Sequence, residues 1–374
     1  MRRVCVGYQD ACMHPLWLSS ASLRMARIFG AESLWVQDHF MWFLPRHVWQ
    51  VEHTPAAKVI RSTDALFDPI AILALAASRI RGVDIGTAVT EPFRRHPMSL
   101  AQTFVTLDHL SRGHAILGIG NGEKENVEPY GIRWHAQVSR LEEALTIIRL
   151  LWESGGAPVS YEGRFWTLKD AIFHLPLYRG RPPRIWVAAH APRMLGLAGR
   201  FGDGWLPNQK HCAADYRNRL QTIAEAREKA GRSMENFVAG QLLLVALGEN
   251  RDAVLERMLE SRVGAALSLL IPAASWTKHG RKHPLGDDHM GFYDIIPTRI
   301  SAAHVDQAAS SMTPELWRSF LYTGSPAQVR DEVAEIVDAG ARHLVIANVG
   351  GAVAGSSPAS VWRLGSLIRK LRRL

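Results

Sequence analysis

Short apolar runs alternate with amphipathic stretches along almost the whole chain, and this alternation constrains the fold more than any other feature. Runs of β-branched and apolar residues predict strands, and the stretches between them have the apolar spacing of helices. Strands that alternate with helices form parallel sheets, because each helix returns the chain to the start of the next strand. Eight strands are expected, at residues 4–8, 33–38, 83–89, 115–120, 184–189, 204–207, 237–247 and 343–349. Eight such units predict an α/β fold, a (β/α)8 TIM barrel.

Proline and glycine residues mark the ends of the expected helices. Pro97, Pro192 and Pro326 lie at first-turn positions, where the missing backbone N–H costs least. Helices are expected at residues 97–110, 138–152, 192–200, 213–229 and 326–339, several of them followed by a glycine. Three segments interrupt the alternation and are interpreted as loop insertions in a single domain over residues 1–374, at about 40–66, 157–181 and 263–322.

Composition and cysteine usage indicate a globular protein of a reducing compartment. With 47% hydrophobic residues, the 374-residue chain can bury a large core. The three cysteines, Cys5, Cys12 and Cys212, share no metal-ligand spacing and give an odd count, which argues against a disulfide framework. No apolar run is long enough to span a bilayer, and no secretory leader is convincing. A cytoplasmic protein is therefore expected.

The formal net charge of +9 is suited to an anionic partner, and much of it comes from residues 363–373. A solvated basic helix explains the same run of charges equally simply. The sequence has no zinc-finger spacing, no RNP-like motif and no interleaving of basic and aromatic residues, so no nucleic-acid partner is expected. The remaining charge would suit a phosphate or a polyglutamate tail.

Polar residues follow the second and fourth predicted strands, at the end of a barrel where active sites are built. Asp38 and His39 leave the second strand side by side, so one could bind a ring substituent while the other exchanges a proton. A histidine capped by its neighbour is the alternative. After the fourth strand comes Glu123, whose pKa should rise if it is buried beside an apolar ring, which would make it a usable acid.

The glycines of residues 118–122 resemble a dinucleotide fingerprint only superficially, because the third glycine is missing and charged residues occupy the turn. Glycines at alternate strand positions instead leave room for a flat ring. At the fifth strand end, Pro192 opens a helix whose free N–H groups form an anion site that Arg193 could reinforce. The alternative for Arg193 is a surface ion pair.

An aromatic segment follows His39 and contains Trp42 and Phe43. It is interpreted either as a lid over an apolar substrate or as a dimer interface. Farther along the chain, His279 and His283 have the spacing of metal ligands on a helix, but Gly280 and Pro284 make a helix there unlikely. No metal is therefore expected.

Taken together in order and spacing, these strand-end segments resemble the luciferase-like superfamily, specifically its branch that uses the 8-hydroxy-5-deazaflavin coenzyme F420. The likeness spans nearly the whole chain. It is carried by Asp38-His39, Gly86-Thr87-Ala88-Val89, Gly120-Asn121-Gly122-Glu123 with Asn126, and the segment 198–205. Residues 128–131, 185–190 and 294–297 further resemble mycobacterial ketoreductases that act on phthiodiolone and phenolphthiodiolone dimycocerosates.

The resemblance implies a role for each matching position. Asp38, Asn126 and Thr90 would contact F420, His190 and Ala191 would hold its phosphate, and a non-prolyl cis peptide would join Ala88 and Val89 behind the ring. Where many relatives have glycines, this chain has His190 and Ala191, which leaves the phosphate contacts open. His39 and Glu123 match the acid-base residues.

The implied activity is reversible hydride transfer between reduced F420 and a carbonyl or alcohol, with a lipid ketone as the substrate. The implied partners are a small-molecule or lipid substrate, a peripheral membrane contact and a second copy of the chain in a homodimer. Two rivals remain: an FMN-dependent monooxygenase of the same fold, and a non-catalytic cofactor- or lipid-binding barrel. The presence of both His39 and Glu123 favours an enzyme.

Overall fold

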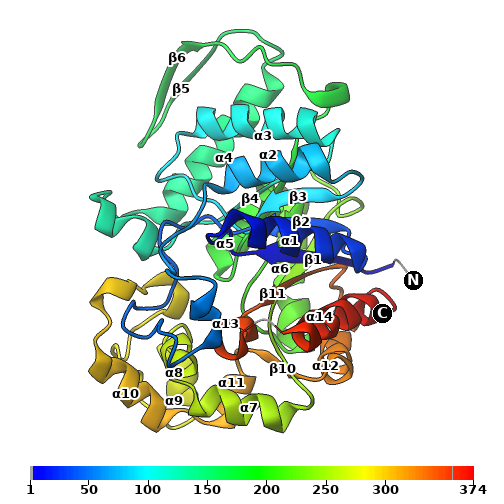
Figure 1. Cartoon of the computed structure of the whole chain (residues 1–374). Helices are drawn as coiled ribbons and strands as arrows, with labels where there is room; N and C mark the ends of the chain where they lie inside the picture. Colours follow the sequence, from blue (N-terminus) through cyan, green and yellow to red (C-terminus); the bar gives the residue numbers. More distant parts are fainter. Residues whose placement is uncertain (1–2, 356) are drawn as a thin grey trace.

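Eight parallel strands close into a barrel surrounded by helices (Figure 1). The computed structural model describes residues 3–355 and 357–374. The barrel closes because β8 pairs with β9, through Gly204 and Val238, while β11 pairs with β1. In order around the barrel the strands are β1 (Cys5–Asp10), β2 (Ser33–Val36), β3 (Asp84–Thr87), β4 (Ala115–Ile119), β7 (Arg184–Val187), β8 (Gly204–Trp205), β9 (Val238–Leu247) and β11 (His343–Asn348). The prediction of a (β/α)8 barrel is confirmed.

The expected helices are also confirmed, each within a few residues of its predicted bounds. Pro97, Pro192 and Pro326 all occupy the first turn, as their fixed φ favours. The helices around the barrel are α1 (Leu16–Ile28), α2 (Pro69–Arg79), α3 (Pro97–Ser111), α4 (Gln137–Glu153), α5 (Pro192–Phe201), α6 (Ala213–Lys229), α7 (Arg251–Glu260), α12 (Pro326–Asp338) and α14 (Pro358–Leu371).

Large aromatic side chains opposite glycines fill the interior of the barrel. The rings of Trp35 and Trp186 lie 5.1 Å apart, and Trp186 packs edge-on against His343 at 4.9 Å. Glycine is required at Gly118, where a Cβ atom would lie 1.8 Å from the carbonyl oxygen of Thr87. These residues form a solid layer, so any cavity must lie farther along the strands, toward their carboxyl ends.

The three interruptions of the alternation have different structures. Residues 40–66 form an irregular segment tied to α13 (Gly350–Ala354) by a hydrogen bond from the Thr54 hydroxyl to the Ala352 carbonyl, 2.7 Å long. Residues 157–181 contain an antiparallel hairpin, β5 (Val159–Glu162) and β6 (Thr167–Ala171), which projects from the barrel (Figure 1).

The last interruption is mainly helical. It contains α8 (Arg262–Ser268), α9 (Ala273–Lys278), α10 (Ala302–Ser311) and α11 (Pro314–Arg318). A short strand that was not expected, β10 (Tyr322–Gly324), pairs with the end of β9. None of the helices in the described part of the chain is long and apolar enough to span a membrane.

Candidate active site

The side chain of His39 lies at the centre of a cluster of polar groups just beyond β2. Its Nδ1 atom is 2.8 Å from Oε1 of Glu125 and 3.6 Å from Oε2 of Glu123. The amide nitrogen of Asn126 is 3.0 Å from the same Nδ1. The partners all come from the segment after β4. The structure therefore brings together His39 and Glu123, which the sequence placed after the second and fourth strands, and Asn126, which the family resemblance indicated.

Hydrogen bonds around Asn126 fix the tautomer of His39. The backbone N–H of Phe40 donates to Oδ1 of Asn126 at 3.0 Å, so the other side-chain atom of Asn126 must be its amide nitrogen. That nitrogen donates to the Asp38 carbonyl at 3.0 Å and faces Nδ1 of His39. Because Nδ1 must accept, its proton lies on Nε2, and Glu125 must be a protonated carboxyl that donates to Nδ1.

Burial explains the protonation of this cluster. Burial raises the pKa of Glu125 to about 8. Burial, assisted by the neighbouring Glu125 carboxyl, raises the pKa of Glu123 well above its usual value. The pKa of His39 is lowered, because burial outweighs the attraction of the neighbouring carboxyl groups. At neutral pH the cluster therefore consists of a neutral imidazole and protonated carboxyl groups.

Glu125 was missed in the sequence, where it appeared only as one of the charged residues of a turn. It is fully buried in a short 3-10 turn, Lys124–Asn126. The signal that could have found it is its position between Glu123 and Asn126, two residues already assigned to the site. His39, Glu123 and Glu125 also have the spacing of a metal site, since their ligand atoms lie within 4.8 Å of one another. The Nδ1 lone pair faces both the Asn126 N–H and the protonated Glu125 carboxyl, which is an arrangement of proton donors rather than of metal ligands.

Asp38 supports this cluster from behind. Its carboxyl is buried, accepts from the Thr90 hydroxyl at 2.6 Å, and forms ion pairs with Arg94 at 3.1 Å and with Arg95. Burial alone would raise the pKa of Asp38, but the two arginines hold it below its usual value. Asp38 lines neither cavity described below, so the structure does not support its expected direct contact with a ring.

The peptide bond between Ala88 and Val89 is cis, as the family resemblance implied. The side-chain amide of Gln9 on β1 donates to the Ala88 carbonyl at 2.7 Å and so fixes this segment, which follows β3, to a strand two positions away in the barrel. Opposite Val89 stands Gly120, where a Cβ atom would approach the Val89 side chain to 3.0 Å. The glycine therefore keeps a narrow space open between the ends of β3 and β4.

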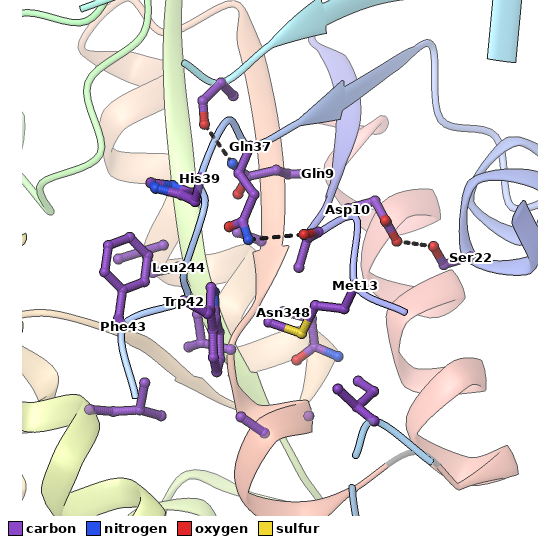
Figure 2. Close-up of a pocket in the computed structure, with 18 of the residues that line it drawn as sticks. Gln9, Asp10, Met13, Ser22, Gln37, His39, Trp42, Phe43, Leu244 and Asn348 are labelled. Carbon is purple, nitrogen blue, oxygen red and sulfur yellow. Dashed lines mark hydrogen bonds between the residues drawn. The ribbon is translucent and has the colours of Figure 1, made fainter. Parts of the chain in front are cut away.

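Two cavities meet at His39, Ala88 and Glu123. The first, of about 260 Å³, has a largely apolar side formed by Trp42, Phe43, Trp49 and Leu244. Figure 2 shows His39 and Phe43 on one side of this cavity and Ser22, from α1, on the other. Four amide side chains also line it: Gln9, Gln37, Asn208 and Asn348.

The second cavity, of about 150 Å³, lies along the cis peptide. Val89, Thr90, Asn126 and His190 contribute to its wall. Most of the sequence-predicted site residues therefore line one cavity or the other, and His39 and Glu123 line both.

His190 is neutral in this environment. Burial lowers its pKa to about 3, and its Nε2 donates to the Asn208 side-chain oxygen, which is 2.8 Å away. Its Nδ1 is buried and has no partner among the described residues. His190 can thus accept a hydrogen bond from a ligand in the second cavity but supplies no positive charge to an anion.

Arg193 corrects one expectation. Its guanidinium lies on the outer surface, 3.0 Å from the Glu142 carboxylate and 2.8 Å from the Ser139 hydroxyl, and it lines neither cavity. Because Pro192 starts α5 at the barrel mouth, the side chain that follows points outward and finds a carboxylate on α4. The surface ion pair, which was the alternative interpretation, describes Arg193. Ala191 precedes the helix and lines neither cavity either.

A family model described as luciferase-like monooxygenase matches residues 22–343, a range that includes His39, Glu123 and Asn126. The chain belongs to the luciferase-like monooxygenase family. Among curated members, the phthiodiolone/phenolphthiodiolone dimycocerosates ketoreductase of Mycobacterium kansasii is 40% identical over 336 residues, which cover 89% of this chain and 91% of the relative.

Solved structures share the luciferase-like fold across nearly the whole chain. An F420-dependent secondary alcohol dehydrogenase, in complex with an F420–acetone adduct, has a TM-score of 0.76 at 19% identity and covers 99% of both chains. The oxygenating constituent of 3,6-diketocamphane monooxygenase from Pseudomonas putida, in complex with FMN, has a TM-score of 0.66 at 16% identity and covers 99% of this chain and 98% of that one. At such identities these similarities establish the fold alone.

Proposed function

We propose that this luciferase-like protein is an F420-dependent ketoreductase that interconverts an apolar ketone and its alcohol. The observation that carries this proposal is the protonated Glu123 carboxyl beside neutral His39, at the junction of two cavities. Such a junction brings a cofactor and a substrate to the same acid. The name of the relative from M. kansasii agrees with a ketone substrate.

The second cavity fits a flat cofactor ring. Gly120 leaves a slot beside the Val89 side chain, and the Ala88–Val89 segment is held in place by Gln9. Thr90, Asn126 and the unpartnered Nδ1 of His190 supply polar groups along the slot. These residues would hold F420, which supplies the hydride when bound.

Residues of the chain itself would transfer the proton. Glu123 gives its proton to the oxygen of the ketone as that oxygen gains negative charge, and in the reverse direction it takes the proton back. His39 donates a hydrogen bond from Nε2 to the same oxygen. Glu125 donates to Nδ1 of His39 and so keeps the tautomer that places the proton on Nε2. General acid catalysis of this kind typically contributes about 10²–10⁴-fold.

The first cavity would hold the substrate. Trp42 and Phe43 lie on its apolar side, close to His39, and the ring of Phe43 packs edge-on against His39 at 4.8 Å. These aromatic groups exclude water from the acid and favour an apolar chain next to the carbonyl carbon. A lipid ketone of the kind named for the ketoreductase relative fits this description.

A cofactor titration tests the proposal. We expect the purified protein to bind F420 with a change in absorbance, and the loaded protein to oxidise reduced F420 when a long-chain ketone is added. Tight FMN binding with oxygen consumption would overturn the proposal. That outcome would favour the second candidate, an FMN-dependent monooxygenase, which is supported by the shared fold of the diketocamphane monooxygenase. Binding of F420 with no turnover of any ketone or alcohol would indicate a non-catalytic carrier.

A further inference from the structure

Two helices carry a local excess of positive charge. The sequence from Ala11 to Ala31, which contains α1, has two arginines and no acidic residue. The sequence from Gly350 to Leu374, which contains α14, has five basic residues and again no acidic one. These seven positive charges compare with a net charge of +9 for the whole chain. The basic residues are Arg24, Arg27, Arg363, Arg369, Lys370, Arg372 and Arg373.

The two helices are neighbours on one side of the barrel (Figure 1). Phe29, which follows α1, packs against Trp362 of α14 with the ring centroids 5.8 Å apart. The guanidinium of Arg369 lies 5.6 Å above the same Phe29 ring. A Cβ atom at Gly365 would lie 2.5 Å from Phe29, so the glycine allows this close approach. The basic residues of the two helices therefore belong to one surface.

Few acidic groups neutralise this surface. Arg363 lies 3.7 Å from Glu249, and Arg372 lies 3.6 Å from Glu32. Within residues 3–355 and 357–374, the other five basic residues have no carboxylate partner, and four of them are exposed. The exposed four are Arg24, Arg27, Arg369 and Arg373.

Large apolar side chains lie among these charges. Trp17 is 61% exposed, Ile28 is 72% exposed and Trp362 is 64% exposed. A tryptophan at the surface of a water-soluble protein exposes a large apolar ring, and at a membrane it places that ring among the lipid headgroups. Exposed arginines together with tryptophan and isoleucine are the composition of a surface that binds an anionic bilayer. Nucleic acid would account for the charges but not for the aliphatic Ile28.

The first cavity extends to α1, one of these two helices. Leu18 and Ser22 of α1 and Gly351 of α13, the short helix that precedes α14, line it, and Figure 2 shows Ser22 on the side away from His39. Trp17 is the immediate neighbour of Leu18 on α1. The apolar cavity therefore extends from the acid cluster toward the basic, tryptophan-bearing helices.

We propose that this surface, the α1–α14 face, binds an anionic lipid membrane. The α1–α14 face consists of Trp17, Arg24, Arg27, Ile28, Trp362, Arg369 and Arg373. The arginines contact lipid phosphates while the three apolar side chains enter the headgroup region, and the cavity beside α1 then opens toward the lipid. Its use as a route for a lipid ketone rests on the proposed function, but membrane binding itself does not.

Vesicle sedimentation of the full-length protein tests the proposal. We expect binding to vesicles of phosphatidylcholine mixed with phosphatidylglycerol and little binding to phosphatidylcholine alone. Raising the salt from about 0.1 M to about 1 M should release the protein, because the Debye length falls from about 10 Å to about 3 Å. The double variant R369E/R373E should bind about tenfold or more weakly, since each Lys or Arg near an anionic surface contributes favourably.

Two matched controls separate local charge from net charge. K169E/R217E makes the same change in net charge at exposed positions on β6 and α6 and should bind within about twofold of wild type. W17S/W362S should also weaken binding, whereas Ile172→Ser, at a 67% exposed site outside the α1–α14 face, should not.

Three results would overturn the proposal. The first is equal binding of the protein to neutral and anionic vesicles. The second is an equal loss of vesicle binding in R369E/R373E and K169E/R217E. The third is a change from dimer to monomer in R369E/R373E without loss of vesicle binding. The last would make the α1–α14 face an interface between copies of the chain. Vesicle binding without ketone turnover would contradict the proposed function and leave the membrane inference standing.

Discussion

Nδ1 of His39 lies 2.8 Å from Oε1 of Glu125, a carboxyl that is completely buried. Because the Asn126 amide nitrogen faces the same Nδ1, the carboxyl must donate, and burial raises its pKa to about 8 so that it holds a proton at neutral pH. The geometry and the electrostatics thus agree on one arrangement. Glu125 fixes the orientation and tautomer of His39 without reaching the substrate itself.

The first prediction concerns the pH dependence of ketone reduction. In the wild type, Glu125 loses its proton as the pH rises through about 8, so His39 loses its donor and the rate should fall. Glu125→Gln cannot titrate, and its amide still donates to Nδ1. We expect this variant to keep kcat within about threefold at pH 7 and to shift the alkaline limb, because only the Glu123 acid then loses a proton. Glu125→Ala removes the donor and should lower kcat about tenfold or more at pH 7.

The pH–rate profiles of the three proteins provide the check, with F420 binding measured alongside. An alkaline limb in Glu125→Gln identical to that of the wild type would show that Glu125 does not control His39. A purely structural role would instead lower the amount of folded protein without moving the limb.

The second prediction concerns the acid. Burial raises the pKa of Glu123 well above its usual value, so the group is protonated where the enzyme would reduce a ketone. Glu123→Gln should lower kcat by about 10²–10⁴-fold, the usual contribution of a positioned acid. The dissociation constant for F420 should change by less than about threefold. Glu128→Gln is the matched control, because this carboxylate only pairs with Arg299 on the surface, at 3.1 Å. Full turnover in Glu123→Gln would remove Glu123 from the mechanism.

The sequence predicted the parts of the protein that obey a periodic pattern. All eight barrel strands and the five expected helices are present, because burial on both strand faces and proline at helix starts leave local signals. His39 and Glu123 were singled out because they stand at strand ends, where a barrel collects its polar residues, and Asn126 was singled out through the family resemblance.

What the sequence could not show depends on contacts between distant segments. Glu125 acquires its role only through His39, 86 positions earlier, and nothing local separates it from a solvated turn residue. The surface pair of Arg193 depends on Glu142 on another helix. The charges of the last helix appeared as a solvated face because only the fold places α1 beside them.

The third prediction concerns stability. The guanidinium of Arg94 is buried between the carboxylates of Asp38 and Glu91 and lies 4.7 Å from the Phe40 ring centroid. Arg94→Leu leaves two buried carboxylates without this partner and should cost about 3–5 kcal/mol in the free energy of unfolding. Arg46→Ala removes an exposed ion pair with Asp64 and is the control, with a much smaller change expected. Urea unfolding followed by circular dichroism measures both. Equal losses in the free energy of unfolding for the two variants would show that the buried ion pairs of Arg94 stabilise the protein no more than an exposed pair does.

The last prediction separates the two cavities. Leu244 lines only the first cavity and Leu206 lines only the second. A larger side chain at either position therefore reduces the space in one cavity and leaves the other unchanged. Leu244→Phe should lower kcat/KM for long-chain ketones by about tenfold and leave acetone and F420 binding nearly unchanged, because overpacking typically costs about 1–3 kcal/mol and only the longer substrate needs the space.

Leu206→Phe should instead weaken F420 binding by about tenfold, with equal effects on kcat/KM for short and long ketones at subsaturating F420. Fluorescence titration gives the F420 affinity, and steady-state rates with ketones of increasing length give kcat/KM. If Leu244→Phe weakened F420 binding and Leu206→Phe discriminated against long ketones, the assignment would be reversed. The first cavity would then hold F420 and the second cavity would hold the substrate. The chemistry at His39 and Glu123 would survive that exchange, because both side chains line both cavities.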